Sequence, residues 1–163
     1  QLPITRACAN AILAKLPDQL ITYHPNWGGD VADWLANESW YAYQIWQSSH
    51  VRDTGNYGYL YESWDKLPVR PAMDTEPNYE DAYGPGASAD DRINDFDVRQ
   101  KSYWGVLSGG AGIGYGSPGV WYWYDYGDVL CPWEGHQASM NWQESLSLPG
   151  AFDMTHLKDR GLQ

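Results

Sequence analysis

The chain has 163 residues, which is about the length of one domain and enough to bury a hydrophobic core. Ten Lys and Arg stand against 21 Asp and Glu, giving a formal net charge of -11 at pH 7. This charge argues against nucleic acid or an acidic polymer as the partner, because phosphate binding needs clustered basic residues. No long apolar run occurs, so no membrane span is expected.

Helical and strand-like segments alternate along the chain. Small and apolar residues at helical spacing predict a first helix that Pro17 ends, and Ser88 is the expected N-cap of a long helix with acidic residues in its first turn. We expect helices at 5–16, within 26–40, at 55–67, at 88–110 and within 139–161, and strands at 19–24, 41–47, 68–77 and 111–116. This alternation predicts an α/β fold with a parallel sheet built from βα units.

Polar side chains stand where the predicted strands end. His24, His50 and Glu76 follow three successive strands and are separated by 26 residues at each step, which is one βα unit. The candidate site residues at the strand ends are His24, Gln47, His50, Asp74, Glu76 and Tyr115. Parallel βα folds keep their chemistry at the carboxyl ends of the strands, so these residues predict a functional site there.

Aromatic residues with a polar atom dominate the aromatic composition. Ten Trp and 13 Tyr stand against two Phe, whereas an ordinary core uses Phe freely. Such rings suit half-solvated surfaces, including a cleft where they stack on the C–H faces of sugars. Trp121 and Trp123 alternate with Tyr122 and Tyr124, so that one pair is expected to line this cleft, with Trp121 as the sugar-binding candidate. Ordinary partly buried aromatics are the alternative interpretation.

Five segments resemble the apiosidase-like family in the same order. They are "YHPNWGGD", "IWQSSH", "RPAMDTEPNYED", "YWGVLSGGAGIGYGSPGVWYW" and the closing "ESLSLPGAFDMTHLKD", and the resemblance that they carry extends over residues 5–160. The resemblance implies a (β/α)8 TIM barrel and glycoside hydrolysis. It also implies a carboxylate nucleophile at the end of the seventh strand, which by position is Glu76. Ser49 departs from the family pattern, where Gly is usual.

The length of the chain falls short of the barrel that the resemblance implies. A TIM barrel takes about 250 residues, so residues 1–163 are expected to form its C-terminal half, with about the last four βα units. The family's acid/base aspartate is then expected outside this chain. Open strand edges would remain, so we expect either a fragment of a longer polypeptide or a chain that packs against a complementary half.

Four acidic residues crowd the segment 71–81. Asp74 precedes Glu76 by two residues and is expected on the same face of the strand, with Cα atoms about 7 Å apart. Two acids on one strand approach a sugar from one side, so we assign Asp74 a supporting role and not that of the acid/base. Tyr79 and Glu80 are expected to hydrogen-bond the sugar or to orient Glu76. For Glu80 and Asp81, solvated loop acids are an equal alternative.

The predicted partner is an oligosaccharide or polysaccharide, without a cofactor. Such substrates are met outside the cytoplasm, so an extracellular or periplasmic location is expected. The first residues lack the features of a signal peptide, and a sequence without an initial Met fits a mature or trimmed product.

Two other functions compete with glycoside hydrolysis. His24, His50, Asp74 and Glu76 are conceivable metal ligands, although no HExxH or similar close pair is present. A non-catalytic carbohydrate-binding or structural protein, derived from the same barrel, is the main alternative. Cys8 and Cys131 allow one disulfide or none, and a structural thiol is slightly favoured over a bridge.

Overall fold

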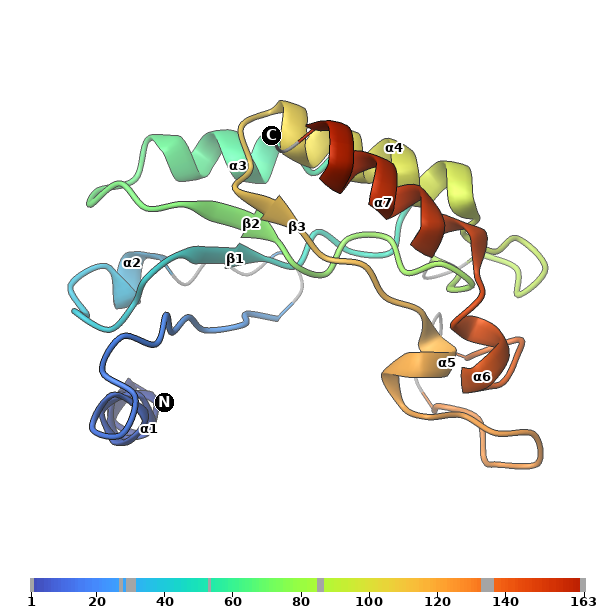
Figure 1. Ribbon diagram of the computed structural model, residues 1–163, viewed down its shortest axis with the longest axis horizontal. Helices are drawn as coiled ribbons and strands as arrows, with labels where there is room; N and C mark the ends of the chain where they lie inside the picture. The colour runs from blue at the N-terminus through green and yellow to red at the C-terminus, as the bar shows by residue number, and fades with distance from the viewer. Residues whose placement is uncertain are drawn as a thin grey trace.

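The computed structural model describes residues 2–26, 28, 32–52, 54–84, 87–132 and 137–161 (Figure 1). Its helices are α1 (Leu2–Leu13), α2 (Ala32–Leu35), α3 (Tyr57–Trp64), α4 (Asp95–Leu107), α5 (Pro118–Trp121), α6 (Trp142–Ser145) and α7 (Pro149–Gly161). Its strands are β1 (Gln44–Trp46), β2 (Ala72–Asp74) and β3 (Gly112–Ile113). None of these helices combines the length and the apolar character that crossing a bilayer requires.

The strands form a parallel sheet in the order β1-β2-β3. Trp46 is paired with Asp74, and Asp74 with Ile113, so the carboxyl ends of the strands lie level. A parallel bridge between Ile21 and Tyr41 places the segment before His24 alongside the residues that lead into β1. The predicted α/β fold with a parallel sheet is therefore confirmed, although the strands are shorter than expected.

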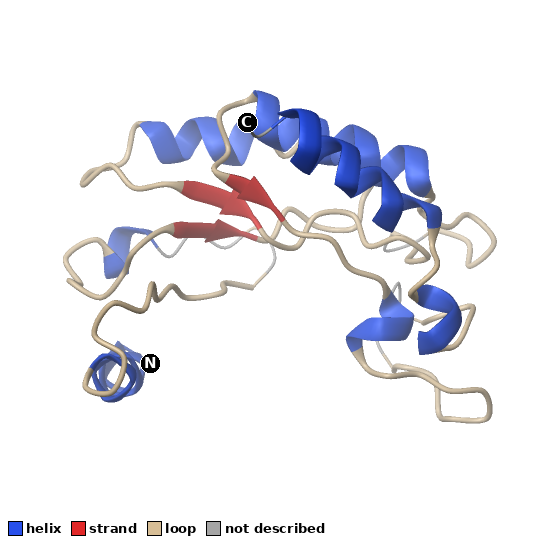
Figure 2. Ribbon diagram, viewed as in Figure 1, coloured by secondary structure: helices blue, strands red, loops and turns tan. Residues whose placement is uncertain are grey.

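Three helices cover one face of the sheet. Figure 2 shows α3, α4 and α7 lying along this face, with α4 and α7 side by side. Leu60 on α3 packs with Trp46 and Ala72, and the Trp46 indole N–H donates to Ser63 Oγ at 2.7 Å. Val98 on α4 forms a second cluster with Ala82 and Ile93, against which Met154 of α7 packs. Burial of these side chains holds the strands in register beneath the helices.

The long helix begins later than the sequence predicts. Its N-cap is Asn94 and not Ser88, because Asn94 accepts from the backbone N–H of Asp97 while Asp97 accepts from that of Asn94. Residue Ile93 is held in extended chain by Ala82, whose carbonyl oxygen accepts its N–H at 2.7 Å. That pairing keeps the preceding residues out of the helix.

The C-terminal part of the chain differs from the prediction in one respect. The closing helix is divided into α6 and α7, because Pro149 disfavours a helical conformation at the residue before it and starts a new helix. The segment 121–124, in which Trp and Tyr alternate, forms the end of α5 and its turn. Cys8 is exposed and Cys131 is buried, and both are free thiols, so the chain has no disulfide between them.

Candidate active site

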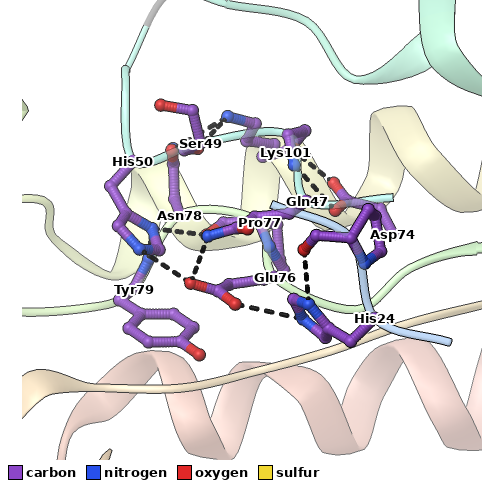
Figure 3. Close-up of polar contacts among 12 residues, drawn as sticks. His24, Gln47, Ser49, His50, Asp74, Glu76, Pro77, Asn78, Tyr79 and Lys101 are labelled. Carbon is purple, nitrogen blue, oxygen red and sulfur yellow. Dashed lines mark hydrogen bonds and ion pairs between the residues drawn. The ribbon is translucent and has the colours of Figure 1, made fainter. Parts of the chain in front are cut away.

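The carboxylate of Glu76 is the centre of a polar cluster at the carboxyl ends of the strands (Figure 3). Glu76 follows β2 by two residues, and its side chain is 15% exposed. Gln47, which directly follows β1, donates its amide to Oε1 at 2.7 Å. His24 Nε2 lies 3.1 Å from Oε2, and His50 Nε2 lies 3.5 Å from Oε1. Both carboxylate oxygens are therefore held by neighbouring nitrogen atoms.

Each imidazole lies between two acceptors. Nδ1 of His24 is 2.8 Å from the carbonyl oxygen of Pro25, and Nδ1 of His50 is 2.7 Å from that of Pro77. The backbone N–H of Tyr79 also donates to His50 Nδ1, at 3.2 Å. Nε2 of each ring faces the Glu76 carboxylate, where an N–H on this nitrogen donates to a carboxylate oxygen. Both rings are thus placed to stabilise negative charge on Glu76.

Tyr79 forms one wall of the cluster. Its ring centroid lies 4.3 Å from that of His50. Burial, and then the nearby charge of Glu76, raise the pKa of Tyr79, so its phenol keeps its proton at neutral pH. The ring is fixed from beneath by Gly116, where an added Cβ would lie 2.6 Å from the ring.

Asp74 is bonded to residues other than those that hold the carboxylate of Glu76. Its side chain is fully buried, and its oxygens accept from Ser48 Oγ at 2.6 Å, from Asn56 Nδ2 at 2.8 Å and from the backbone N–H of Ser48 at 3.3 Å. Burial raises the pKa of Asp74, while these hydrogen bonds and the charge of Lys101 lower it. The supporting role expected of Asp74 therefore takes the form of anchoring the loop after β1.

Lys101 is a buried cation that the sequence analysis missed. Its ammonium donates to the carbonyl oxygen of Ser49 at 2.7 Å, to Asn78 Oδ1 at 3.1 Å and to the carbonyl oxygen of Val51 at 3.4 Å. Burial lowers its pKa to about 8, against the charge of Asp74. The ammonium thus joins the loop that carries His50 to the loop that follows Glu76.

A helical pattern in the sequence indicates the burial of Lys101. The buried residues of α4 include Val98, Lys101, Ser102 and Gly105, which are spaced as one face of a helix. Lys101 stands in the middle of this face, where an ordinary surface Lys does not belong. This spacing could have indicated from the sequence that Lys101 is buried.

Glu80 and Tyr115 hold the start of α7. Glu80 is buried, accepts from the phenol of Tyr115 at 2.7 Å and accepts from the backbone N–H of Gly150 at 3.1 Å. Burial raises the pKa of Glu80, and burial followed by the contact with Glu80 raises the pKa of Tyr115. Asp81 is buried as well and accepts from the backbone N–H of Ser139 at 2.8 Å. The solvated-loop alternative for both acids is wrong, and Glu80 and Tyr115 contact each other where sugar contacts were expected.

The Glu80 contacts predict a contrast between two substitutions. Glu80→Ala leaves the Tyr115 and Gly150 donors buried without an acceptor, and we expect a loss of about 2–4 kcal/mol in unfolding free energy. Glu80→Gln can accept from Gly150 and donate to the Tyr115 oxygen, so we expect a loss below about 1 kcal/mol. Urea denaturation measures both. Equal losses would show that the charge of Glu80, and not its hydrogen bonding, holds α7.

Ser49 occupies a backbone conformation that favours glycine. Its φ is 83°, in the left-handed region, and its carbonyl oxygen accepts from Lys101. We expect Ser49→Gly to raise the unfolding free energy by up to about 1 kcal/mol, because relief of strain exceeds the added entropy of the unfolded chain. Thermal and urea unfolding test this, with Ser49→Ala as the control. A gain in the Ala variant equal to that in the Gly variant would contradict a backbone cause.

The remaining candidate lies elsewhere in the fold. Trp121 is on α5, partly exposed, with its ring centroid 5.8 Å from that of Tyr122. The structure therefore gathers one group of sequence-predicted residues, and places Asp74, Glu80, Tyr115 and Trp121 outside it. The group around the carboxylate consists of His24, Gln47, His50, Glu76 and Tyr79.

Metal binding by the proposed ligands is not supported by their arrangement. Across the described ranges, no group of three His, Cys, Asp or Glu side chains is placed to hold a metal ion. The oxygens of Asp74, one of the conceivable ligands, are bonded to Ser48 and Asn56. The contacts around the carboxylate of Glu76 are a hydrogen bond from Gln47 and the approaches of two imidazole nitrogens.

A carboxylate held by an amide and two imidazoles at the ends of parallel strands is typical of an α/β enzyme site. Two solved structures similar to the chain are described as glycoside hydrolases. A glycoside hydrolase family 5 protein from Bacteroides vulgatus is 28% identical with a TM-score of 0.79, over 93% of this chain and 36% of that one. A second glycoside hydrolase is 26% identical with a TM-score of 0.80, over 94% of this chain and 37% of that one.

The chain thus spans little more than a third of each of these structures. The family model of the apiosidase-like catalytic domain matches residues 1–162, and the chain belongs to the apiosidase-like family. The resemblance found in its motifs is thereby confirmed. No match was found among the curated proteins.

Proposed function

We propose that this chain supplies the nucleophile of a glycoside hydrolase active site, and that Glu76 is this nucleophile. The observation that carries the proposal is the setting of its carboxylate, which is partly exposed at the carboxyl ends of the strands and held through both oxygens. N–H donors at this position stabilise the ionised form that attack requires. The family and the similar structures support glycoside hydrolysis as the reaction class.

In the proposed reaction, an oxygen of Glu76 forms a bond to the anomeric carbon while the bond from that carbon to the leaving oxygen breaks. A second carboxyl group gives its proton to the leaving oxygen. Water, deprotonated by the same group, then displaces Glu76 and releases the sugar. Gln47 and His24 keep the carboxylate aimed, and Tyr79, whose phenol stays protonated, is placed to donate a hydrogen bond to a sugar oxygen.

The second carboxyl group comes from outside this chain in our proposal. Asp74 and Glu80, the acids nearest to Glu76 in sequence, are both buried and bonded to structural partners. We propose that residues 1–163 form the C-terminal half of a (β/α)8 barrel and contribute about its last four βα units. The share of about a third that the chain covers in the similar structures supports this. The other half, in the same polypeptide or in a complementary chain, is the expected partner.

The proposed substrate is a side chain of a plant or microbial polysaccharide that ends in apiose or a similar branched sugar. Family membership supports this substrate class. The excess of acidic residues disfavours a polyanion and is compatible with neutral sugars. An extracellular or periplasmic location follows from the substrate.

Covalent trapping tests the assignment of Glu76. The complete polypeptide that carries this chain is incubated with a 2-deoxy-2-fluoroglycoside bearing a good leaving group, which slows release of the glycosyl enzyme. We expect a mass increase of one fluoroglycosyl group on the peptide with Glu76 and none on the peptide of the Glu76→Gln variant. A label on another carboxylate, or turnover with inverted products and no label, would overturn the proposal.

The alternative of a non-catalytic carbohydrate-binding or structural protein is favoured by one observation. The carboxylates of Asp74 and Glu80 are bonded to structural partners and cannot serve as the acid/base. Within residues 71–81, Glu76 is then the one carboxylate assigned to the reaction. Isothermal titration with apiose-containing side-chain oligosaccharides from pectin separates the two functions. Binding without product release or trapping, by the complete polypeptide, would establish the alternative.

A further inference from the structure

Exposed aromatic rings gather on α5, its following turn and α6, away from the Glu76 cluster. Trp123 is 65% exposed, Tyr126 59% and Trp121 42%, and Trp142 is partly buried. The rings of Trp123 and Trp142 meet edge to face with centroids 5.1 Å apart. We call Trp121, Trp123, Tyr126 and Trp142 the aromatic platform.

The platform has a rigid support. An added Cβ at Gly119 on α5 would lie 2.1 Å from Ser145 Oγ on α6, so the two helices approach as closely as glycine allows. The backbone N–H of Trp142 donates to the carbonyl oxygen of Tyr124 at 2.8 Å. These contacts fix the aromatic residues of one segment against those of the other.

Trp123 stands in a conformation that disfavours it. Its φ is 59°, and it follows Tyr122, the C-cap of α5, at the position where glycine usually ends a helix. A bulky side chain in the left-handed region is strained, and a ring that is 65% exposed gains little from burial in return. A strained residue whose exposed ring adds little to folding indicates that the ring serves binding.

The platform and Glu76 both lie beyond the carboxyl ends of the strands. Figure 1 shows α5 and α6 beyond the carboxyl end of β3, reached through the segment that follows this strand. Glu76 lies at the carboxyl end of the neighbouring strand β2. A polymer bound at Glu76 can therefore extend toward the platform.

The charges around the platform select its ligand. Residues 118–132 and 137–147 contain no Lys or Arg, whereas Asp125, Asp128 and Glu144 are acidic. Glu144 accepts from the phenol of Tyr126, and Asp125 accepts from the backbone N–H of Tyr126 at 2.8 Å. Carboxylates among aromatic rings suit the hydroxyls and C–H faces of neutral sugars, and they repel polyanions and anionic membranes.

We propose that the aromatic platform is a second carbohydrate site, which binds neutral sugar units of the polysaccharide away from the bond cleaved at Glu76. The proposal rests on the proposed function, since it takes the ligand to be the same polymer. Trp123 is its central residue, with Trp142 holding the Trp123 ring in place. The platform then raises the affinity for long substrates and leaves the bond-breaking step unchanged.

Affinity electrophoresis of the complete polypeptide tests the platform. The probes are galactomannan, arabinan and xyloglucan as neutral polymers, and polygalacturonate as the polyanion. We expect retardation by at least one neutral polymer and none by polygalacturonate. Trp123→Gly, which accepts a φ of 59° without strain, should weaken this binding about tenfold. Trp123→Phe, which keeps a ring, should weaken it less than about threefold.

Two further measurements separate this proposal from others. Trp123→Gly should leave the melting temperature unchanged or higher, and its covalent trapping at Glu76 by a small fluoroglycoside should match that of the parent, so failure here and failure of the proposed function are distinguishable. Unchanged retardation of Trp123→Gly, or no retardation of the parent by any neutral polymer, would overturn the proposal. So would a dimer in size exclusion that Trp123→Gly dissolves, since it would identify the platform as a protein interface.

Discussion

Replacing Glu76 by Gln should lower kcat/KM for glycoside cleavage by at least about a thousandfold in the complete polypeptide. The substitution keeps the shape of the side chain but removes the attacking carboxylate. Gln47 and both imidazoles would then face a neutral amide in place of a charge. Because the attack exists only in the transition state, we expect kcat to fall far more than KM rises. Steady-state kinetics with an aryl glycoside and with a natural oligosaccharide measures the effect.

A matched control and a rescue sharpen this result. Glu62→Gln, at an exposed acid on α3, should retain full activity, which shows that loss of one negative charge is not the cause. Azide added to Glu76→Ala should restore turnover of an activated glycoside, because azide takes the place of the carboxylate and forms a glycosyl azide of inverted configuration. Activity of Glu76→Gln within tenfold of the parent would exclude Glu76 as the nucleophile.

The position of the Glu76 cluster could be predicted because it follows from the repeat of βα units. His24, His50 and Glu76 are separated by equal steps in sequence, and parallel strands bring the ends of successive units to one edge. Gln47 could be predicted in the same way, as it follows β1 directly. Spacing in the sequence was sufficient for these predictions, because residues one βα unit apart come together at the carboxyl ends of a parallel sheet.

The supporting network could not be predicted, because its contacts join distant parts of the chain. Lys101 and the carbonyl oxygen of Ser49 are 52 residues apart, and Glu80 and the N–H of Gly150 are 70 apart. In sequence, Asp74 and Glu80 look like further site acids, and only the tertiary packing shows that their oxygens are occupied. The shift of the α4 start from Ser88 to Asn94 has a similar origin, in the pairing of Ile93 with Ala82.

Lys101→Met should reduce the unfolding free energy at pH 7 by about 3–5 kcal/mol, the largest stability effect we expect from a single substitution. Met keeps the stem of the side chain but leaves Ser49 O and Asn78 Oδ1 without their donor. It also removes the positive charge that lowers the pKa of the buried Asp74. Urea denaturation measures the loss, with the exposed Lys158→Met on α7 as the control. A loss below about 1 kcal/mol would show that Lys101 does not join the two loops.

The lowered pKa of Lys101 makes the unfolding free energy depend on pH. The folded pKa of Lys101 is about 8, below its usual value of 10.5, so between these values the unfolded chain binds a proton that the folded chain has released. Stability therefore rises with pH through this window, since it rises wherever the unfolded state holds more protons. Tyr41 acts in the opposite sense: burial raises its pKa from 10.0 to about 12, so stability falls above pH 10, and the raised pKa values of Tyr79 and Tyr115 add to this fall.

The parent should consequently be most stable near pH 9–10, between the rise from Lys101 and the fall from Tyr41. In Lys101→Met the rise above pH 8 should disappear while the fall above pH 10 remains, so the difference between parent and variant grows from pH 8 to pH 10. Unfolding free energies at half-unit pH steps measure this difference. Parallel curves for the two proteins would mean that the amine of Lys101 keeps its proton in the folded state throughout this range, which would contradict the lowered pKa.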